Sequence, residues 1–140
     1  NLTAKMEWAA FDPIHVVLTG DYVRNLGFNQ QEILNRTGLS VQRRVNGYQT
    51  MLTVGTPKIK QRGEWQANVA YKYLERDAVL DALTDSDFHL GGTNAKGFVV
   101  GGSYGVDDNA WVNLRWISTN QIDGAPLAID TLQLDLNTRF

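Results

Sequence analysis

The chain has 140 residues, of which 43% are hydrophobic and 20% charged, and its formal net charge is −2. This length corresponds to one domain, and the near-neutral charge argues against nucleic acid as a partner. The chain has no cysteine, which excludes disulfides, thiolate metal sites and thiol catalysis. A membrane-spanning helix needs about 18 consecutive apolar residues, and the sequence has no such run.

Seven segments show the alternation of apolar and polar residues that is typical of β-strands, whose successive side chains face opposite sides of a sheet. In chain order they cover residues 1–8, 13–24, 46–56, 63–76, 97–106, 110–119 and 127–140. In the fourth segment one face carries Trp65, Val69 and Tyr73. The opposite face carries Glu64 and Lys72. The pattern predicts an all-β fold in which each strand has one apolar and one polar face.

The connections between these strands alternate in length. Short ones lie at 10–13, 56–63 and 107–109, and longer ones run over roughly 25–46, 77–95 and 119–126. Outer-membrane barrels have this asymmetry, with short periplasmic turns and longer extracellular loops. Two stretches of the longer connections have helix-like sequences, 30–35 and 78–83. A soluble β-sandwich would not require the strict alternation.

The polar face carries charges near the middle of strands, at Lys72, Arg115 and Asp135. Buried in a small soluble core, such charges would cost several kcal/mol unless paired, on the order of the penalty for buried ions, whereas a water-filled lumen accommodates them. Aromatic residues of the apolar face fall toward the strand ends, as in the two girdles of a barrel. Those toward the short turns are Trp8, Trp65, Tyr104 and Phe140, and those toward the longer loops are Tyr22, Tyr48, Tyr73, Phe98 and Trp116. The sequence therefore predicts a transmembrane antiparallel up-and-down β-barrel.

Nine charged residues are candidates for lining the pore. They are Lys5, Glu7, Asp21, Glu64, Lys72, Arg76, Arg115, Asp135 and Arg139. Rings of one sign would set ion selectivity, but these signs are mixed and predict neither a cation nor an anion preference. Gly97, Gly101 and Gly105 leave a nearly bare strip on the same face, which could admit an inward-folded loop or let the sheet bend.

Two expectations concern the extent of the chain. Seven strands are an odd number, whereas bacterial single-chain barrels have an even one, so we expect residues 1–140 to be the C-terminal segment of one larger barrel domain. The last segment resembles the C-terminal assembly signal of outer-membrane barrels, with alternating Leu132, Leu134 and Leu136 and the terminal Phe140. That resemblance implies recognition by the barrel-assembly machinery through edge pairing.

A more specific resemblance covers most of the chain. It is carried by FDPIHVVLTGDYVRN, by VGTPKIKQRGEWQANVAYKYLERDAVLDALTDSDF and by GGTNAKGFVVGGSYGV. These stretches resemble the C-terminal end of the bacterial "putative porin" family. The resemblance implies a Gram-negative outer-membrane channel of roughly 16 strands, within the size range of such barrels.

Catalysis, metal binding and a cofactor have little support in the sequence. No serine has a nucleophile-elbow context, and neither His15 nor His89 has a serine–acid partner. The acidic run of 77–87 could offer oxygen ligands to a divalent cation, but it lacks the spacing of a calcium loop. Arg43 and Arg44 could contact anionic lipopolysaccharide at the outer rim, although a solvated loop is the simpler interpretation.

We therefore expect a non-enzymatic porin of the bacterial outer membrane, without a cofactor, that lets small hydrophilic solutes or ions diffuse through a water-filled lumen. Two alternatives remain open: a non-channel barrel of a structural or adhesin-like surface protein, and a soluble ligand-binding β-barrel. The expected partners are outer-membrane lipid and lipopolysaccharide, with a homotrimer as a further possibility that no sequence feature supports.

Overall fold

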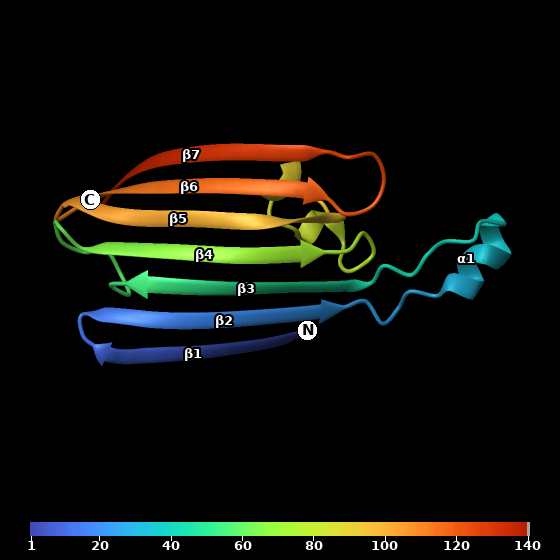
Figure 1. The fold of residues 1–140 in the computed structure, drawn as a ribbon, viewed down its shortest axis with the longest axis horizontal. Coiled ribbons are helices and arrows are strands. Elements are labelled where there is room, and N and C mark those ends of the chain that lie inside the picture. Colours follow the sequence, from blue (N-terminus) through green and yellow to red (C-terminus); the bar gives the residue numbers. More distant parts are fainter. Residues whose placement is uncertain (140) are drawn as a thin grey trace.

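The computed structural model describes residues 1–139 and consists of one seven-stranded sheet in which every strand pairs antiparallel with its sequence neighbours (Figure 1). The strands are β1 (Leu2–Phe11), β2 (Ile14–Arg24), β3 (Asn46–Gly55), β4 (Trp65–Leu74), β5 (Ala95–Asp107), β6 (Ala110–Gln121) and β7 (Ala128–Thr138). The predicted all-β, up-and-down architecture is confirmed, and the curved sheet is consistent with part of a barrel. Phe140, which the sequence assigned to the aromatic girdle and the assembly signal, lies outside the described residues.

All seven predicted segments form strands, and their ends differ from the prediction by a few residues. The largest difference lies at the end of the first strand, which continues to Phe11, three residues beyond the predicted segment. β4 ends at Leu74, so that Arg76 lies in the following connection, and β5 begins two residues earlier than predicted, at Ala95. Beyond Leu74, the N–H of Glu75 donates to the carbonyl of Asn46 and that of Asp77 to the carbonyl of Arg44, so hydrogen bonds in the same register continue for a few residues past β4.

The register aligns the two faces of the strands across the whole sheet. One row of directly opposed residues consists of Met6, Leu18, Leu52, Val69, Val100, Trp116 and Leu132. The neighbouring row on the other face consists of Glu7, Val17, Thr53, Asn68, Gly101, Arg115 and Gln133. Opposed residues in antiparallel strands share a face. We call the face of the first row the apolar face and that of the second row the polar face.

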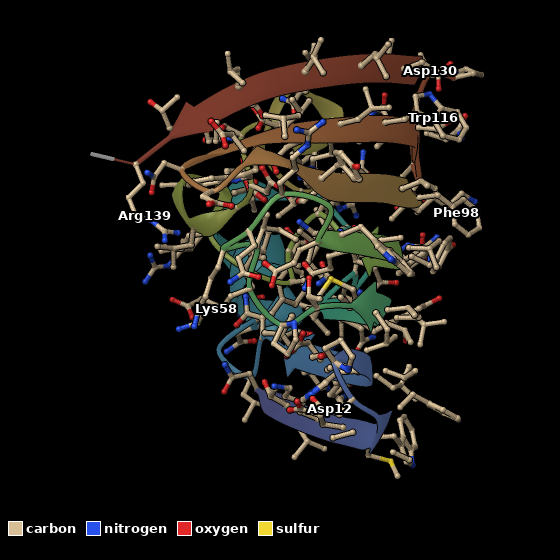
Figure 2. The ribbon with its side chains drawn as sticks, turned by 90° about the vertical axis from the view of Figure 1, so that its left-hand side faces the viewer. Asp12, Lys58, Phe98, Trp116, Asp130 and Arg139 are labelled. Carbon is tan, nitrogen blue, oxygen red and sulfur yellow. The ribbon has the colours of Figure 1, made fainter. Side chains whose placement is uncertain are left out.

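The apolar face is exposed along its whole width. Leu134 and Leu136 are each 71% exposed, and Val69 near the sheet centre is 41% exposed. The labelled side chains of Phe98, Trp116 and Asp130 gather on the same side of the curved sheet (Figure 2). Soluble monomers rarely expose apolar patches larger than a few hundred Å², so a face of this kind needs an apolar environment.

The small core lies on the polar face, under the connection between β4 and β5. Phe88, Ala95 and Ile117 form a buried cluster with the partly buried Val99 packed against it. Phe88 belongs to the short 3-10 helix η2 (Phe88–Leu90), and η1 (Asp81–Leu83) precedes it in the same connection. The helix-like stretch 78–83 is therefore a single 3-10 turn, and η2 was not predicted.

The connection between β2 and β3 carries α1 (Gln30–Thr37), which confirms the predicted helical stretch 30–35 and extends it by two residues. The Asn29 side chain accepts a hydrogen bond from the Glu32 N–H, and Gly38 ends the helix at φ 72°, where glycine has no steric penalty. Figure 1 shows α1 beyond the strand ends, away from the sheet. No helix within residues 1–139 is long and apolar enough to cross a membrane.

The longer connections interlock at their common end of the sheet. The Arg44 guanidinium lies 3.1 Å from an Asp123 carboxylate oxygen and 3.6 Å from a Glu75 carboxylate oxygen. The Asn94 side-chain amide donates to the Asp123 carbonyl, and the Asp123 N–H donates back to the Asn94 side-chain oxygen. Arg44 thus ties three connections together, and these contacts hold the ends of the strands in place.

The glycine strip of β5 brings backbone segments close together. At Gly105 the connection between β3 and β4 folds against the strand, with hydrogen bonds from the Gly63 N–H to the Gly105 carbonyl and from the Gly105 N–H to the Glu64 carbonyl, both 2.9 Å. At Gly97 the β6 backbone comes so near that an added Cβ would lie 2.0 Å from the Ser118 carbonyl oxygen. The bare strip therefore lets the backbone of β6 and of the β3–β4 connection come close to β5.

The close contact at Gly97 predicts that Gly97→Ala destabilises the protein by about 1–3 kcal/mol, the usual cost of overpacking a filled site. Gly20→Ala, in β2, is the control, because its added Cβ meets nothing within 4 Å. The measurement is urea unfolding in lipid vesicles, followed by tryptophan fluorescence. Equal unfolding midpoints for the two variants would contradict the close approach of β5 and β6.

Candidate functional site

A groove of about 570 Å³ opens on the polar face, between the 75–94 connection and strands β3 to β7. The strands contribute polar side chains that face this groove: Gln49, Asn68, Lys72, Ser103, Asn113, Arg115, Gln133 and Asp135. The 75–94 connection contributes Asp85, Asp87 and Phe88. The groove is therefore bounded by a charged sheet on one side and by an acidic connection with one aromatic side chain on the other.

Phe88 anchors the connection to the sheet. Its side chain is 1% exposed and packs against Ala95 and Ile117. The Lys72 ammonium lies 4.6 Å from the centre of the Phe88 ring, in cation–π geometry. Burying a phenylalanine side chain stabilises by about 1.5–3 kcal/mol, so this contact is a substantial part of what holds the connection against the polar face.

Arg115 forms the ionic contact between the sheet and the connection. One guanidinium nitrogen lies 2.8 Å from an Asp85 carboxylate oxygen, and the other lies 3.5 Å from an Asp87 carboxylate oxygen. Burial alone would raise the pKa of Asp85, but the Asp87 backbone N–H and the Arg115 guanidinium together hold the pKa of that carboxyl below its ordinary value. The carboxylate is therefore charged at neutral pH and pairs with Arg115.

His89 forms the third contact, and its backbone has an unusual conformation. Nδ1 lies 2.9 Å from the Thr119 hydroxyl oxygen, and that hydroxyl donates to the Ile129 carbonyl, so Nδ1 is the donor to Thr119. His89 has φ 57° and Leu90 has φ 62°. Non-glycine residues in this left-handed region cost roughly 1–2 kcal/mol each. Such strain persists only where surrounding contacts hold it, and here Phe88 and His89 supply them.

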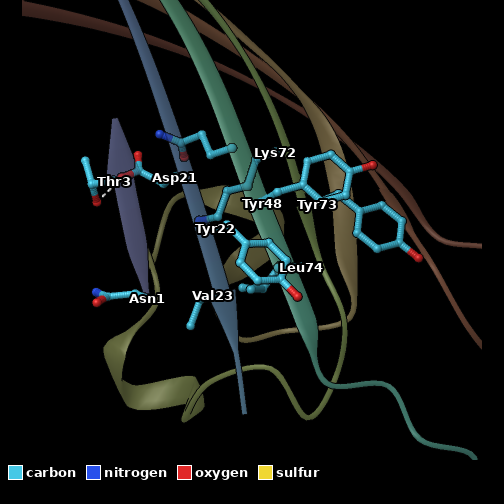
Figure 3. Close-up of a pocket in the computed structure, with 11 residues that line it drawn as sticks. Asn1, Thr3, Asp21, Tyr22, Val23, Tyr48, Lys72, Tyr73 and Leu74 are labelled. Atoms are coloured by element: carbon cyan, nitrogen blue, oxygen red, sulfur yellow. Dashed lines mark hydrogen bonds between the residues drawn. The ribbon is translucent and has the colours of Figure 1, made fainter. Parts of the chain in front are cut away.

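The structure brings three of the nine predicted pore-lining residues to the groove, namely Lys72, Arg115 and Asp135. Three others lie elsewhere on the polar face in β1 and β2. There Lys5 pairs with Glu7 at 3.3 Å, and Glu7 also contacts the His15 ring at 2.7 Å. Asp21 accepts a hydrogen bond from the Thr3 hydroxyl at 2.7 Å, near the long-loop end (Figure 3).

The remaining three candidates lie at strand ends. Glu64 precedes β4, and its carboxylate accepts the backbone N–H groups of Lys60 and Gln61, which lower the pKa of that carboxyl. Arg76 donates to the Gln42 carbonyl at 2.8 Å, within the loop network. Arg139 follows β7, and its guanidinium lies 5.5 Å from the Trp111 ring. These residues stabilise the ends of the sheet and do not face the groove.

The acidic run of the 75–94 connection does not converge on one point. Asp85 and Asp87 meet at Arg115, whereas an Asp81 carboxylate oxygen lies 2.8 Å from the Thr93 hydroxyl oxygen and Asp77 contacts Arg76. Within residues 1–139, no group of three or more acidic or histidine side chains could hold a metal ion. The sequence lacks the spacing of a calcium loop here, and it gave no signal for the role of Phe88.

The aromatic residues of the apolar face lie at several levels between the two ends of the strands. Tyr22, Tyr48 and Tyr73 are directly opposed in one row near the long-loop end, and the Tyr48 and Tyr73 rings stack with centroids 5.1 Å apart (Figure 3). Phe98 lies one row farther in, where its ring centroid is 4.9 Å from that of Tyr71. Trp116 lies in the next row, opposite Val100 and Leu132. Toward the short turns, Trp65 and Tyr104 oppose each other, and Trp8 lies on β1.

An up-and-down antiparallel sheet with an exposed apolar face and a charged, grooved polar face defines the class: part of a porin-like β-barrel. The chain matches the family model described as "Putative porin" over residues 1–140 and belongs to that family. No curated protein and no solved structure matches the chain. Family membership supports a porin-like role in the outer membrane.

The contacts of His89 predict that acid weakens the docking of the 75–94 connection. Burial lowers the pKa of His89 from its ordinary value of 6.5. The undocked histidine therefore binds protons more readily, and docking loses stability as the pH falls below about 6.5. Asp85 acts in the same direction at lower pH. Its pKa is lower in the docked connection than its ordinary value, so protonation of the carboxyl breaks the ion pair with Arg115 and destabilises docking.

Hydrogen exchange of residues 75–94, measured from about pH 8 down to about pH 5 and corrected for intrinsic rates, tests this linkage. His89→Asn is the control, because asparagine tolerates the left-handed backbone and its amide can donate to Thr119 without titrating. Protection should fall with pH in the natural protein and fall less in the variant. Parallel pH profiles would show that His89 does not govern docking.

Proposed function

We propose that this chain forms part of the wall of a passive outer-membrane channel in Gram-negative bacteria, with the polar face toward a water-filled lumen and the apolar face toward lipid. Small hydrophilic solutes or ions would diffuse along the polar face, with no catalytic step and no cofactor. The observation that carries the proposal is the register, which keeps one exposed apolar face across seven strands while Lys72 and Arg115 lie on the opposite one.

The distribution of charge along the strands supports this orientation. On the apolar face, charged residues occur only near strand ends: Arg24, Lys96 and Asp130 toward the longer connections and Asp107 beside the turn after β5. On the polar face, Arg115 lies in the middle of β6. A charge at the middle of a lipid-facing strand costs about 2–4 kcal/mol, and the cost falls toward the interfaces, which agrees with the positions observed.

Lipopolysaccharide is the lipid partner that we propose for the long-loop end. Arg44, one of the two arginines that the sequence suggested for this role, pairs with Glu75 and Asp123 and is not free to bind phosphate. Arg43, Arg24 and Lys96 are exposed. Lys96 lies directly beside Tyr73 in the tyrosine row, at the level where cations and aromatic rings meet lipid headgroups.

Two further partners follow from the same proposal. We propose that β7, an edge strand of the sheet, is the element on which the barrel-assembly machinery acts, because an unpaired edge can add a strand. A homotrimer would require a contact surface on the apolar face, and an oligomer analysis of the protein in mild detergent would detect it.

A second candidate function is a non-channel barrel with a structural or adhesin-like role. The observation that favours it is the placement of the 75–94 connection on the polar face, since side chains that fill a lumen close it. The two functions differ in conductance: a porin gives stable, stepwise currents in planar bilayers, and a plugged barrel gives none.

The channel function predicts that the protein, reconstituted into planar bilayers, forms pores with steady single-channel steps and lets small sugars enter liposomes. Protein denatured before reconstitution is the control for leakage caused by detergent. Intact barrels that incorporate into the bilayer without conducting would refute the porin role and favour the structural one.

The orientation of the faces is testable because the chain has no cysteine of its own. Leu52 lies on the apolar face and its neighbour Thr53 on the polar face. In liposomes, a hydrophilic thiol reagent should modify Thr53→Cys and leave Leu52→Cys unmodified, and brominated acyl chains should quench a fluorophore only at position 52. The reverse result would mean a soluble barrel with an apolar interior.

A further inference from the structure

We propose that the contact between the 75–94 connection and strands β4 to β6 is a fixed, electrically balanced constriction that selects solutes by size and hydrogen bonding, so that uncharged hydrophilic molecules are the preferred solutes. This inference rests on the proposed channel function, because it assigns a role to the groove within the lumen.

The first step is that the connection is docked and not a free lid. Phe88 is buried against Ala95 and Ile117, and His89 is 9% exposed and bonded to Thr119. The connection also braces itself, since the Gly92 N–H donates to the Thr84 hydroxyl oxygen and the Thr93 hydroxyl donates to the Arg76 carbonyl. Segments with buried apolar anchors and internal hydrogen bonds open rarely, so the groove keeps its width while solutes pass.

The second step is the charge of the contact. Four charged groups meet there: Lys72 and Arg115 from the sheet, and Asp85 and Asp87 from the connection. Two positive and two negative charges sum to zero. If the connection were absent, the positive charges of Lys72 and Arg115 would face only the carboxylate of Asp135 in the groove lining, which would leave a net positive charge. The aspartates therefore cancel a field that would otherwise favour anions.

The third step is the chemistry of the groove next to this contact. Asn68, Ser103, Asn113 and Gln133 line it with amide and hydroxyl groups, and Asp135, the only other charged side chain in the groove lining, lies one row nearer to the short turns. Amides and hydroxyls both donate and accept hydrogen bonds. They can replace the water around a hydroxyl-bearing solute as it moves along the groove, without any requirement for its charge.

The test compares three changes of charge in bilayers under a salt gradient. The double variant Asp85→Asn with Asp87→Asn leaves a net positive charge and should shift the permeability ratio toward anions. Arg115→Gln leaves a net negative charge and should shift it toward cations. Each shift should be roughly two- to five-fold, the effect of a unit charge a few ångströms from a passing ion in water. Asp130→Asn, the same change on the apolar face, is the control and should have no effect.

Size selection is tested separately at the anchor. Phe88→Ala should undock the connection, raise the single-channel conductance and admit larger uncharged sugars into liposomes, whereas Phe88→Leu keeps an apolar anchor and should behave like the natural protein. Leu83→Ala, an exposed position of the same connection, controls for general loosening. Heat-modifiable mobility on gels identifies the variants that have folded.

The outcomes separate the two proposals. If the natural protein forms no pores, the channel function itself fails. If it conducts, but the aspartate and Arg115 variants share its ion preference and Phe88→Ala keeps its size limit, the channel function stands and the constriction is refuted. Arg115→Lys, which keeps the charge, should restore the natural ion preference. If it behaves like Arg115→Gln, the effect is one of shape and the electrostatic argument is wrong.

Discussion

The structure depends on one constraint, the antiparallel register that links β1 to β7, with shifts beside the short turns between Trp8 and Phe11 and between Gly105 and Asp107. Side chains alternate with a period of two, so a slip of one residue in any strand pair would move that strand's entire apolar set to the opposite face. Leu18, Leu52 and Val69 are directly opposed in three successive strands, and Thr53 and Asn68 oppose each other in the next row of the other face. The apolar and polar faces therefore form only when every strand pair keeps its register.

Strand content and the separation of the two faces could be predicted because both are local. Alternation is visible within a single segment such as 63–76, and pairing between sequence neighbours follows when short connections join them. The role of the 75–94 connection could not be predicted in the same way. Its contacts join Asp85 to Arg115 and His89 to Thr119, each about thirty residues away along the chain, and no periodic pattern marks such pairs.

Gly97 and Phe88 illustrate the limit of sequence analysis. The bare glycine strip left two interpretations open, that it admits an inward-folded loop or that it lets the sheet bend. The structure shows that two backbones approach the strip, β6 at Gly97 and the β3–β4 connection at Gly105. Phe88 docks beside it onto Ala95 and Ile117. The sequence does not distinguish Phe88 from the other apolar residues of this connection, such as Leu83 and Leu90, until its partners are known.

Apolar anchoring, more than ion pairing, explains how a connection can stay docked against a polar, hydrated face. The Arg115 contacts are partly exposed, with side-chain exposures of 34% for Arg115 and 39% for Asp85, and exposed ion pairs contribute only about 0–1 kcal/mol. The left-handed backbone of His89 and Leu90 costs a comparable or larger amount, roughly 1–2 kcal/mol for each residue. Burial of Phe88, at about 1.5–3 kcal/mol, offsets that strain. The ion pairs then set the charge of the groove, while the phenylalanine sets its shape.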